Sequence, residues 1–119
     1  MRFVAFRKAD ADTEAGAQPT RELVDAMLAY QRRMIDAGVM VAGEGLRPSA
    51  EGVRVLFEGG KTTVVDGPFT ESKELVAGFS LLETRTREEA LEWLRRWPRE
   101  DSGGRVRLEL RPVAEEGDG

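Results

Sequence analysis

The apolar residues in the first half of the chain recur with a strand-like period, then a helical one, then a strand-like one again. Residues 2–6 are β-branched and aromatic, which predicts a strand, and the polar, alanine-rich residues 8–19 predict a loop. The next apolar side chains recur at helical spacing and stop at a glycine, so we expect a helix over residues 20–37. Residues 39–46 return to β-prone side chains and predict a second strand.

The middle of the chain carries the pattern of a β-hairpin. Two β-prone runs, residues 53–57 and 61–65, are separated by Gly59 and Gly60. Tight hairpin turns require positive φ angles, which glycine adopts without strain. The pattern therefore predicts two strands joined by this turn.

The last third of the chain predicts a strand, a helix and a final strand. Residues 77–84 form a further β-prone run. Thr86 and Glu89 have the spacing of a capping box that opens a helix, and Pro98 is placed to stop that helix. In the strand predicted at residues 105–111, the inward positions are Val106, Leu108 and Leu110.

The order of these elements predicts an α+β fold. Two split βαβ halves around an antiparallel sheet, with both helices on one face, give a ferredoxin-like arrangement, here with an extra hairpin. Because such a sheet leaves its second face uncovered, we expect a second copy of the chain to cover that face in a homodimer. We expect one domain over residues 1–112 and a disordered acidic tail over residues 113–119.

The composition removes several kinds of chemistry. The 119 residues include no cysteine and no histidine, so thiolate or histidine catalysis and sulfur- or histidine-ligated metals are excluded, and we expect no metal and no cofactor. With 18 basic and 22 acidic side chains the net charge is −4, which argues against nucleic acid or an anionic membrane as a partner. The lack of cysteine, of a long apolar run and of a signal-peptide pattern favours a cytoplasmic location.

Residues 66–74, with the sequence DGPFTESKE, lie between the predicted hairpin and the next strand, and we call them the DGPF loop. Each residue type in this loop is consistent with a structural role in a turn. Gly67 tolerates the backbone restriction that Pro68 imposes, and Asp66 can accept hydrogen bonds from turn amides. Phe69 is expected to plug into the core.

The DGPF loop resembles the signature of the DGPF subgroup of the YCII-related proteins, with Ser72 where that subgroup usually has threonine. The segments DAGVMVAGEGLRPS (residues 36–49) and GFSLLE (residues 78–83) are similar to neighbouring parts of the same family. The resemblance covers nearly all of residues 1–112. It implies a ferredoxin-like fold in a dimeric α+β barrel.

The resemblance also implies two ideas about function. In one branch of the family, a histidine on the first helix and an aspartate after the second helix are proposed as a catalytic pair. The corresponding positions here hold Met27 and Trp97, so we do not expect the chemistry of that pair in this chain. Genes for DGPF proteins are frequently found beside those of extracytoplasmic-function sigma factors, so the resemblance also implies a sigma factor as a partner.

The polar residues expected nearest a cleft beside the DGPF loop are Asp66, Lys73 and Glu44. Tyr30 and Phe69 are candidate walls of the same ligand site. A carboxylate beside a lysine can act as a base and an electrostatic stabiliser, or it can form a salt bridge that only pins the loop. Two hypotheses follow: a small-molecule cleft in a dimer, purely binding or weakly catalytic, or a protein-interaction module that serves a sigma factor.

Overall fold

A computed structural model describes residues 1–115 of the chain. The part of the predicted acidic tail that begins at residue 116 lies outside the described residues. The helices, 3-10 turns (η) and strands are β1 (Arg2–Lys8), α1 (Ala11–Glu14), α2 (Arg21–Asp36), β2 (Met40–Gly45), η1 (Ser49–Glu51), β3 (Val53–Glu58), β4 (Lys61–Asp66), η2 (Ser72–Glu74), β5 (Val76–Glu83), α3 (Arg87–Leu94), η3 (Asp101–Gly104) and β6 (Leu108–Pro112).

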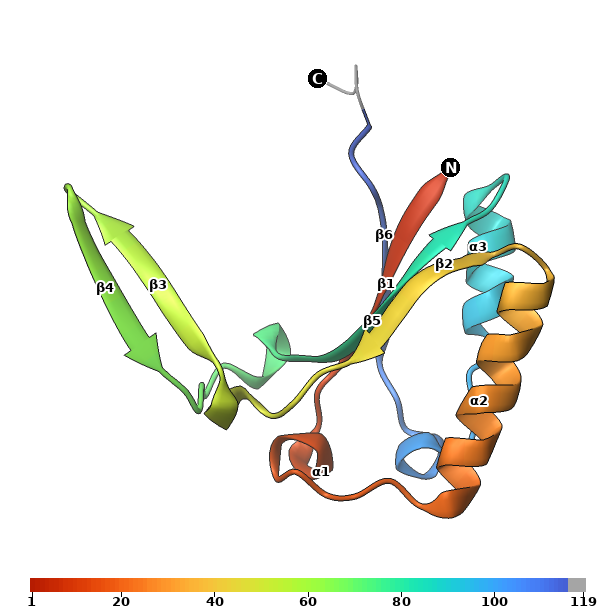
Figure 1. Ribbon diagram of the computed structural model, residues 1–119, viewed down its shortest axis with the longest axis horizontal. Helices are drawn as coiled ribbons and strands as arrows, with labels where there is room; N and C mark the ends of the chain where they lie inside the picture. The colour runs from red at the N-terminus through yellow and green to blue at the C-terminus, as the bar shows by residue number, and fades with distance from the viewer. Residues whose placement is uncertain (116–119) are drawn as a thin grey trace.

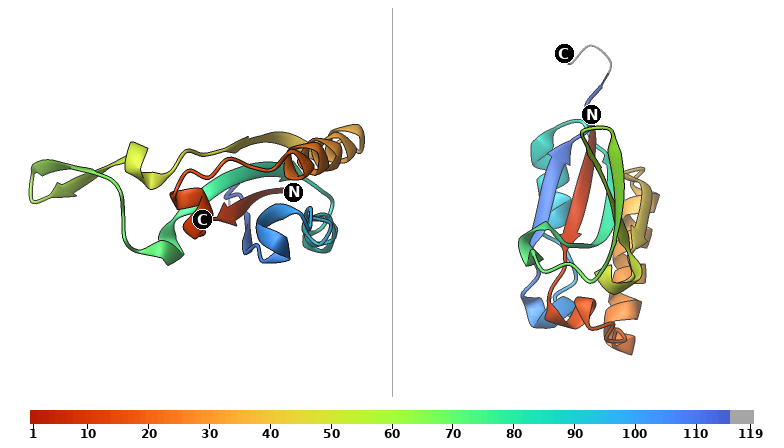
Figure 2. Two further views of the ribbon diagram at one scale, coloured as in Figure 1. Left: turned by 90° about the horizontal axis from the view of Figure 1, so that it is seen from below. Right: turned by 90° about the vertical axis from the view of Figure 1, so that its left-hand side faces the viewer.

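Four strands form an antiparallel sheet in the order β2-β5-β1-β6. Helix α2 connects β1 to β2 and helix α3 connects β5 to β6, which is the split βαβ order of a ferredoxin-like fold. Both helices lie on one face of this sheet (Figures 1 and 2). The predicted α+β fold class is therefore confirmed, and the extra hairpin is inserted between β2 and β5 as a separate two-stranded sheet.

The core lies between the sheet and the two long helices. Its buried residues are Ala5, Tyr30, Met34, Val39, Leu82 and Leu94. Tyr30 is completely buried, and its hydroxyl donates a hydrogen bond of 2.7 Å to the carbonyl of Trp93. Burial raises the pKa of Tyr30 to about 12. Tyr30, expected from the sequence as a wall of a ligand cleft, is therefore placed in the core.

The ends of α2 follow the predicted signals. The Thr20 hydroxyl accepts a hydrogen bond of 3.1 Å from the amide of Leu23, so the helix begins where a capping residue was expected. Gly38 follows the last turn with a φ of 72°, a left-handed conformation that glycine adopts without a Cβ clash. The prediction of a helix over residues 20–37 is confirmed.

The second long helix begins as predicted but ends earlier. The Thr86 hydroxyl accepts from the amide of Glu89 at 3.1 Å, which confirms the capping residue. Helix α3 ends at Leu94, although Pro98 was the residue predicted to stop it. The residue before a proline is disfavoured in the α conformation, and residues 95–97 form tighter turns before Pro98.

Two local predictions need correction. The predicted loop at residues 8–19 contains the one-turn helix α1, because Asp10 and Thr13 form a reciprocal capping box with hydrogen bonds of 2.9 and 2.8 Å. The last strand begins at Leu108 and not at residue 105. Its start is delayed because Ser102 and the two glycines after it have positive φ angles that turn the chain.

The hairpin of β3 and β4 projects from the side of the sheet opposite the helices (Figures 1 and 2). Its turn is as predicted, since Gly59 and Gly60 have φ angles of 53° and 83°. The radius of gyration of 16.2 Å exceeds the roughly 13.5 Å expected for a compact domain of this length. The exposed apolar side chains on the hairpin are Val53, Val55, Leu56, Phe57, Val64 and Val65.

Candidate functional site

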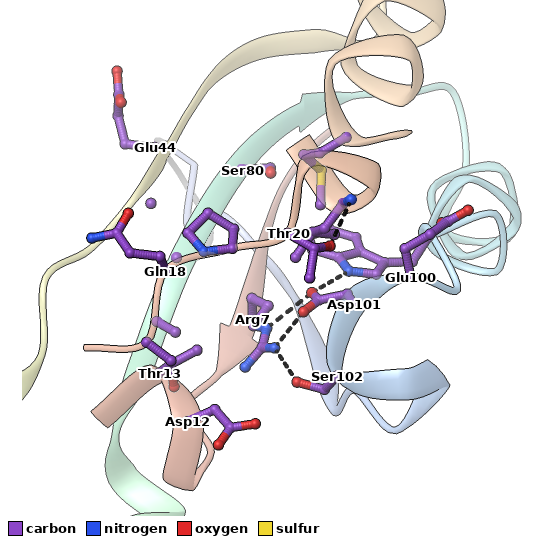
Figure 3. A pocket seen from close by; sticks show the side chains of 18 of the residues that line it. Arg7, Asp12, Thr13, Gln18, Thr20, Glu44, Ser80, Glu100, Asp101 and Ser102 are labelled. Atoms are coloured by element: carbon purple, nitrogen blue, oxygen red, sulfur yellow. Dashed lines mark hydrogen bonds and ion pairs between the residues drawn. The ribbon is translucent and has the colours of Figure 1, made fainter. Parts of the chain in front are cut away.

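A cavity of about 560 Å³ lies between the first half of α2 and the sheet (Figure 3). Its walls come from α1, the segment after it, α2, β5 and the chain that follows α3. The apolar part of the lining includes Pro19, Leu23, Met27, Ala77 and Trp97. The volume falls within the range of small-molecule sites in proteins.

A buried ion pair forms the base of this cavity. The Arg7 guanidinium donates to the Asp101 carboxylate through Nη2 at 2.6 Å and through Nε at 3.2 Å. Arg7 and Asp101 are only 7% and 6% exposed. Burial would lower the pKa of Arg7, but the hydrogen bonds and charge of Asp101 outweigh it and raise that pKa. The Arg7 guanidinium therefore remains charged in the folded protein.

Two further side chains complete this cluster. The Ser102 hydroxyl accepts from Arg7 Nη2 at 2.9 Å and donates to the Asp10 carboxylate. Burial would raise the pKa of Asp10, but the Ser102 hydroxyl, the Thr13 amide and the charge of Arg7 outweigh it and hold that pKa at about 2. We call Arg7, Asp10, Asp101 and Ser102 the floor cluster.

Trp97 joins the floor cluster to the apolar wall. Its indole Nε1 donates to Asp101 Oδ2 at 2.9 Å, and its ring meets the edge of the Tyr30 ring at a centroid distance of 5.6 Å. Met27 lines the same cavity from α2. The two positions that correspond to the proposed catalytic pair of the resembled branch therefore meet in one cavity, where they supply a thioether and an indole.

The carboxylates of the floor cluster are held by hydrogen bonds and ion pairs. A carboxylate with a pKa of about 2, such as Asp10, is a weak base near neutral pH. Both oxygens of Asp101 already accept hydrogen bonds, from Arg7 and from Trp97. These groups fix one another in place and offer a rigid, polar base under an apolar wall.

The five ligand-site candidates predicted from the sequence lie in different parts of the structure. Glu44 is exposed on β2 and lines the cavity. Tyr30 lies behind the cavity in the core. Asp66, Phe69 and Lys73 do not line this cavity and lie toward the hairpin. Of the five candidates, only Glu44 lines this cavity, and a ligand site that includes Asp66, Phe69 and Lys73 stays a prediction.

The DGPF loop is held as a turn by its neighbours. A Cβ atom on Gly67 would lie 1.8 Å from the Ser49 carbonyl oxygen, so this position admits only glycine. The Ser49 hydroxyl accepts from the amide of Phe69 at 3.1 Å and donates to the Glu14 carboxylate at 2.5 Å. The predicted turn is confirmed, and α1 and η1 position it.

Phe69 differs from its expected role in the core. It is half-buried, and its ring lies under the Arg54 guanidinium, whose carbon is 3.9 Å from the ring centroid. Phe69 belongs neither to the buried core cluster nor to the apolar residues packed against it. In the described structure, Arg54 also pins the loop through ion pairs with Glu71 and Glu74 at 3.4 and 3.5 Å, a role expected of Lys73.

Sequence reasoning missed the floor cluster, although one signal was present. Phe3, Ala5 and Arg7 occupy alternate positions of β1, and all three are buried. A charged residue at an inward position indicates a buried ion pair, because an unpaired buried charge is costly. No local pattern marks Asp101, which lies 94 residues away along the chain.

Three comparisons with known proteins bear on this chain. A model of the YCII-related domain matches residues 1–114. An uncharacterised protein of Rhizobium meliloti strain 1021 is 36% identical over 67 residues, or 56% of this chain and 54% of that protein, so the matched region spans about half the length of the relative. A solved structure of 5-chloro-2-hydroxyhydroquinone dehydrochlorinase from Burkholderia phenoliruptrix AC1100, in complex with 2,5-dihydroxybenzoquinone, has a TM-score of 0.44 and 15% identity over 92% of this chain and 91% of that chain.

Proposed function

This chain belongs to the YCII-related family, and from that premise we propose that it binds a small organic molecule in the cavity between α2 and the sheet. The observation that supports this proposal is the floor cluster beneath an apolar wall. A buried ion pair contributes little net stability, because desolvation offsets most of the attraction between the charges. A rigid polar group at the base of a cavity is instead what orients a ligand.

Blocking the cavity tests this proposal. A library of small metabolites is screened for ligands that raise the melting temperature, since a ligand at 100 times its Kd stabilises the folded state by about 2.7 kcal/mol. Met27→Trp fills the cavity from α2, and Leu28→Trp adds the same ring at the next, exposed position. Ligands should stabilise the wild type and Leu28→Trp but not Met27→Trp. Equal stabilisation of both variants would place binding elsewhere.

The proposal includes a homodimer. Val4, Phe6 and Leu81 are half-buried on strands β1 and β5, at positions that alternate with the buried residues of the helix-covered face. Among the described residues, both long helices cover the other face of the sheet. The hairpin extends from this same open side. A second copy that packs on this side would bury both the open face and apolar residues of the hairpin.

Light scattering tests the dimer. We expect a dimer at micromolar concentration and a monomer for Leu81→Glu, because a carboxylate in the centre of an apolar interface would be buried without a partner. Glu83→Gln, at the exposed end of the same strand, is the control. A monomeric wild type would contradict this part of the proposal.

A second candidate function is favoured by the exposed hairpin. In this alternative, the chain is an interaction module for an extracytoplasmic-function sigma factor, and Phe57, which is 79% exposed, is part of the contact. Co-expression of the chain with such a sigma factor from the same genome, followed by purification, separates the candidates. Co-purification that Phe57→Ser abolishes would support the interaction module, and its absence would leave the small-molecule site.

A further inference from the structure

We infer that this cavity accepts a small organic cation, or a neutral molecule, with an apolar body, and that it rejects carboxylates and phosphates. The inference rests on the proposed function, because it names the ligand class of the same cavity. Among the charged lining residues, one cation, Arg7, faces four carboxylates: Asp12, Glu44, Glu100 and Asp101.

The single cation is not available to an incoming anion. Arg7 Nε and Nη2 face the carboxylates of Asp101 and Asp10, and Nη1 donates to the Lys8 carbonyl at 2.7 Å. The Arg7 side chain is 8% exposed. Two carboxylates therefore offset its charge before any ligand arrives. A carboxylate or phosphate ligand would have to displace Asp10 or Asp101 from the floor cluster to gain a full counter-charge.

The remaining carboxylates, Asp12, Glu44 and Glu100, stand around the cavity, and we call them the rim. Figure 3 shows Asp12, Glu44 and Glu100 on different sides of it, apart from one another. All three are exposed, and within the described residues none of them forms an ion pair. Like charges around a concave surface focus a negative potential toward its interior. A cation is drawn into this cavity and an anion is repelled from it.

The apolar wall selects the body of the ligand. Leu23 and Met27 from α2 line this cavity together with the indole of Trp97, and no lining side chain of α2 carries a charge. An indole face attracts an organic cation through its ring quadrupole, and a thioether adapts its shape to an aromatic body. A protonated amine attached to one or two rings matches this combination of wall, rim and volume.

Three probes that share one naphthalene body test the ligand class. Binding of 1-naphthylmethylammonium, 1-naphthalenemethanol and 1-naphthoate is measured by calorimetry at pH 7 and low salt. We expect the ammonium to bind at least about tenfold more tightly than the carboxylate, with the alcohol between them, and this preference to shrink in high salt. Equal or tighter binding of 1-naphthoate would overturn the ligand class while leaving the cavity as a site. Failure of all three probes to bind the folded protein would overturn the proposed function itself.

Matched charge variants test whether the rim carboxylates cause the preference for the ammonium probe. Asp12→Asn with Glu100→Gln removes two rim charges, and Glu58→Gln with Glu88→Gln removes two exposed charges on the hairpin and on α3. The rim variant should lower the affinity for the ammonium by about threefold to tenfold and leave the alcohol nearly unchanged. The control variant should change neither affinity. An ammonium preference that is the same in both variants would show that the rim carboxylates do not set it.

Discussion

The helix-covered sheet buries charged side chains, whereas the projecting hairpin exposes apolar ones. In the sheet region, an arginine and an aspartate are more than nine-tenths buried beneath a cavity. In the hairpin, Phe57 is 79% exposed and Val64 is 63% exposed. Burial of charge and exposure of hydrocarbon both lower the stability of an isolated chain. In the proposed function, the charges beneath the cavity, which satisfy one another, provide a rigid base for a ligand, and a protein surface covers the hydrocarbon of the hairpin.

The two regions also differ in how they are fixed. In the floor cluster, hydrogen bonds join Arg7 of β1 to Asp101, which lies 94 positions later in the chain. The hairpin contains only two strands, and an isolated pair of strands is marginally stable in water. We therefore expect substitutions in the floor cluster to affect folding and substitutions in the hairpin to affect assembly.

The largest expected effect follows from removing one partner of the buried ion pair. Asp101→Asn removes the carboxylate that Arg7 contacts twice and leaves Asp10 as its remaining counter-charge, so it should lower the free energy of unfolding by about 2 to 3 kcal/mol. Urea denaturation measures this loss. Glu92→Gln, which removes the exposed partner of Arg95, should change it by less than about 1 kcal/mol. Similar small losses in both variants would show that Asp101 is not needed to compensate the buried charge of Arg7.

The next effect concerns assembly through the hairpin. Val55 and Phe57 lie on one face of β3 and Leu56 on the other, because strand side chains alternate. Val55→Ser with Phe57→Ser should raise the dimer dissociation constant at least about tenfold, whereas Leu56→Ser should have a smaller effect. Sedimentation of both variants measures this difference. A dimer that tolerates the double substitution would leave the hairpin without a role in assembly.

A smaller effect is expected at the DGPF loop. Phe69→Ala removes a half-buried ring and its contact with Arg54, so it should lower the free energy of unfolding by about 1 to 2 kcal/mol. A fully buried phenylalanine would lose about 3 to 5 kcal/mol through the cavity left behind. Thermal and urea unfolding distinguish these ranges. A loss in the higher range would return Phe69 to the core position predicted from the sequence.

The smallest effect is a pH dependence. Asp10 has an ordinary pKa of 3.8 and a folded-state pKa of about 2, so its stabilisation is complete above pH 3.8 and is lost as the pH falls toward 2. Because its side chain is 32% exposed, this contribution is at most about 1 to 2 kcal/mol. Asp10→Asn should flatten the loss of stability between these pH values. An unchanged acid limb in the variant would show that other carboxylates cause it.

The fold was largely predictable because its signals are local. The Thr20 and Thr86 caps, the Gly59-Gly60 turn and the alternation in the strands each depend on residues a few positions apart. Local patterns were not sufficient where the same alternation fits both a strand packed on the core and a strand that projects from the sheet. Val53, Val55 and Phe57 alternate as in a half-buried strand, yet the hairpin that carries them projects from the sheet.

The candidate site was less predictable because long-range contacts create it. Asp66, Lys73 and Glu44 are polar residues predicted to lie near the DGPF loop, but only Glu44 lines the cavity. The pairing of Arg7 with Asp101 depends on how β1 meets the segment after α3, which no sequence window contains.

The most direct test of the proposed site maps where a ligand binds. Amide resonances of the isotopically labelled protein are followed by NMR during a titration with 1-naphthylmethylammonium. We expect the largest shift changes at residues 97–103 and around Leu23 and Met27, and none at the hairpin or the DGPF loop. The largest changes at Asp66 and Lys73, or no changes at the cavity, would contradict the proposed site.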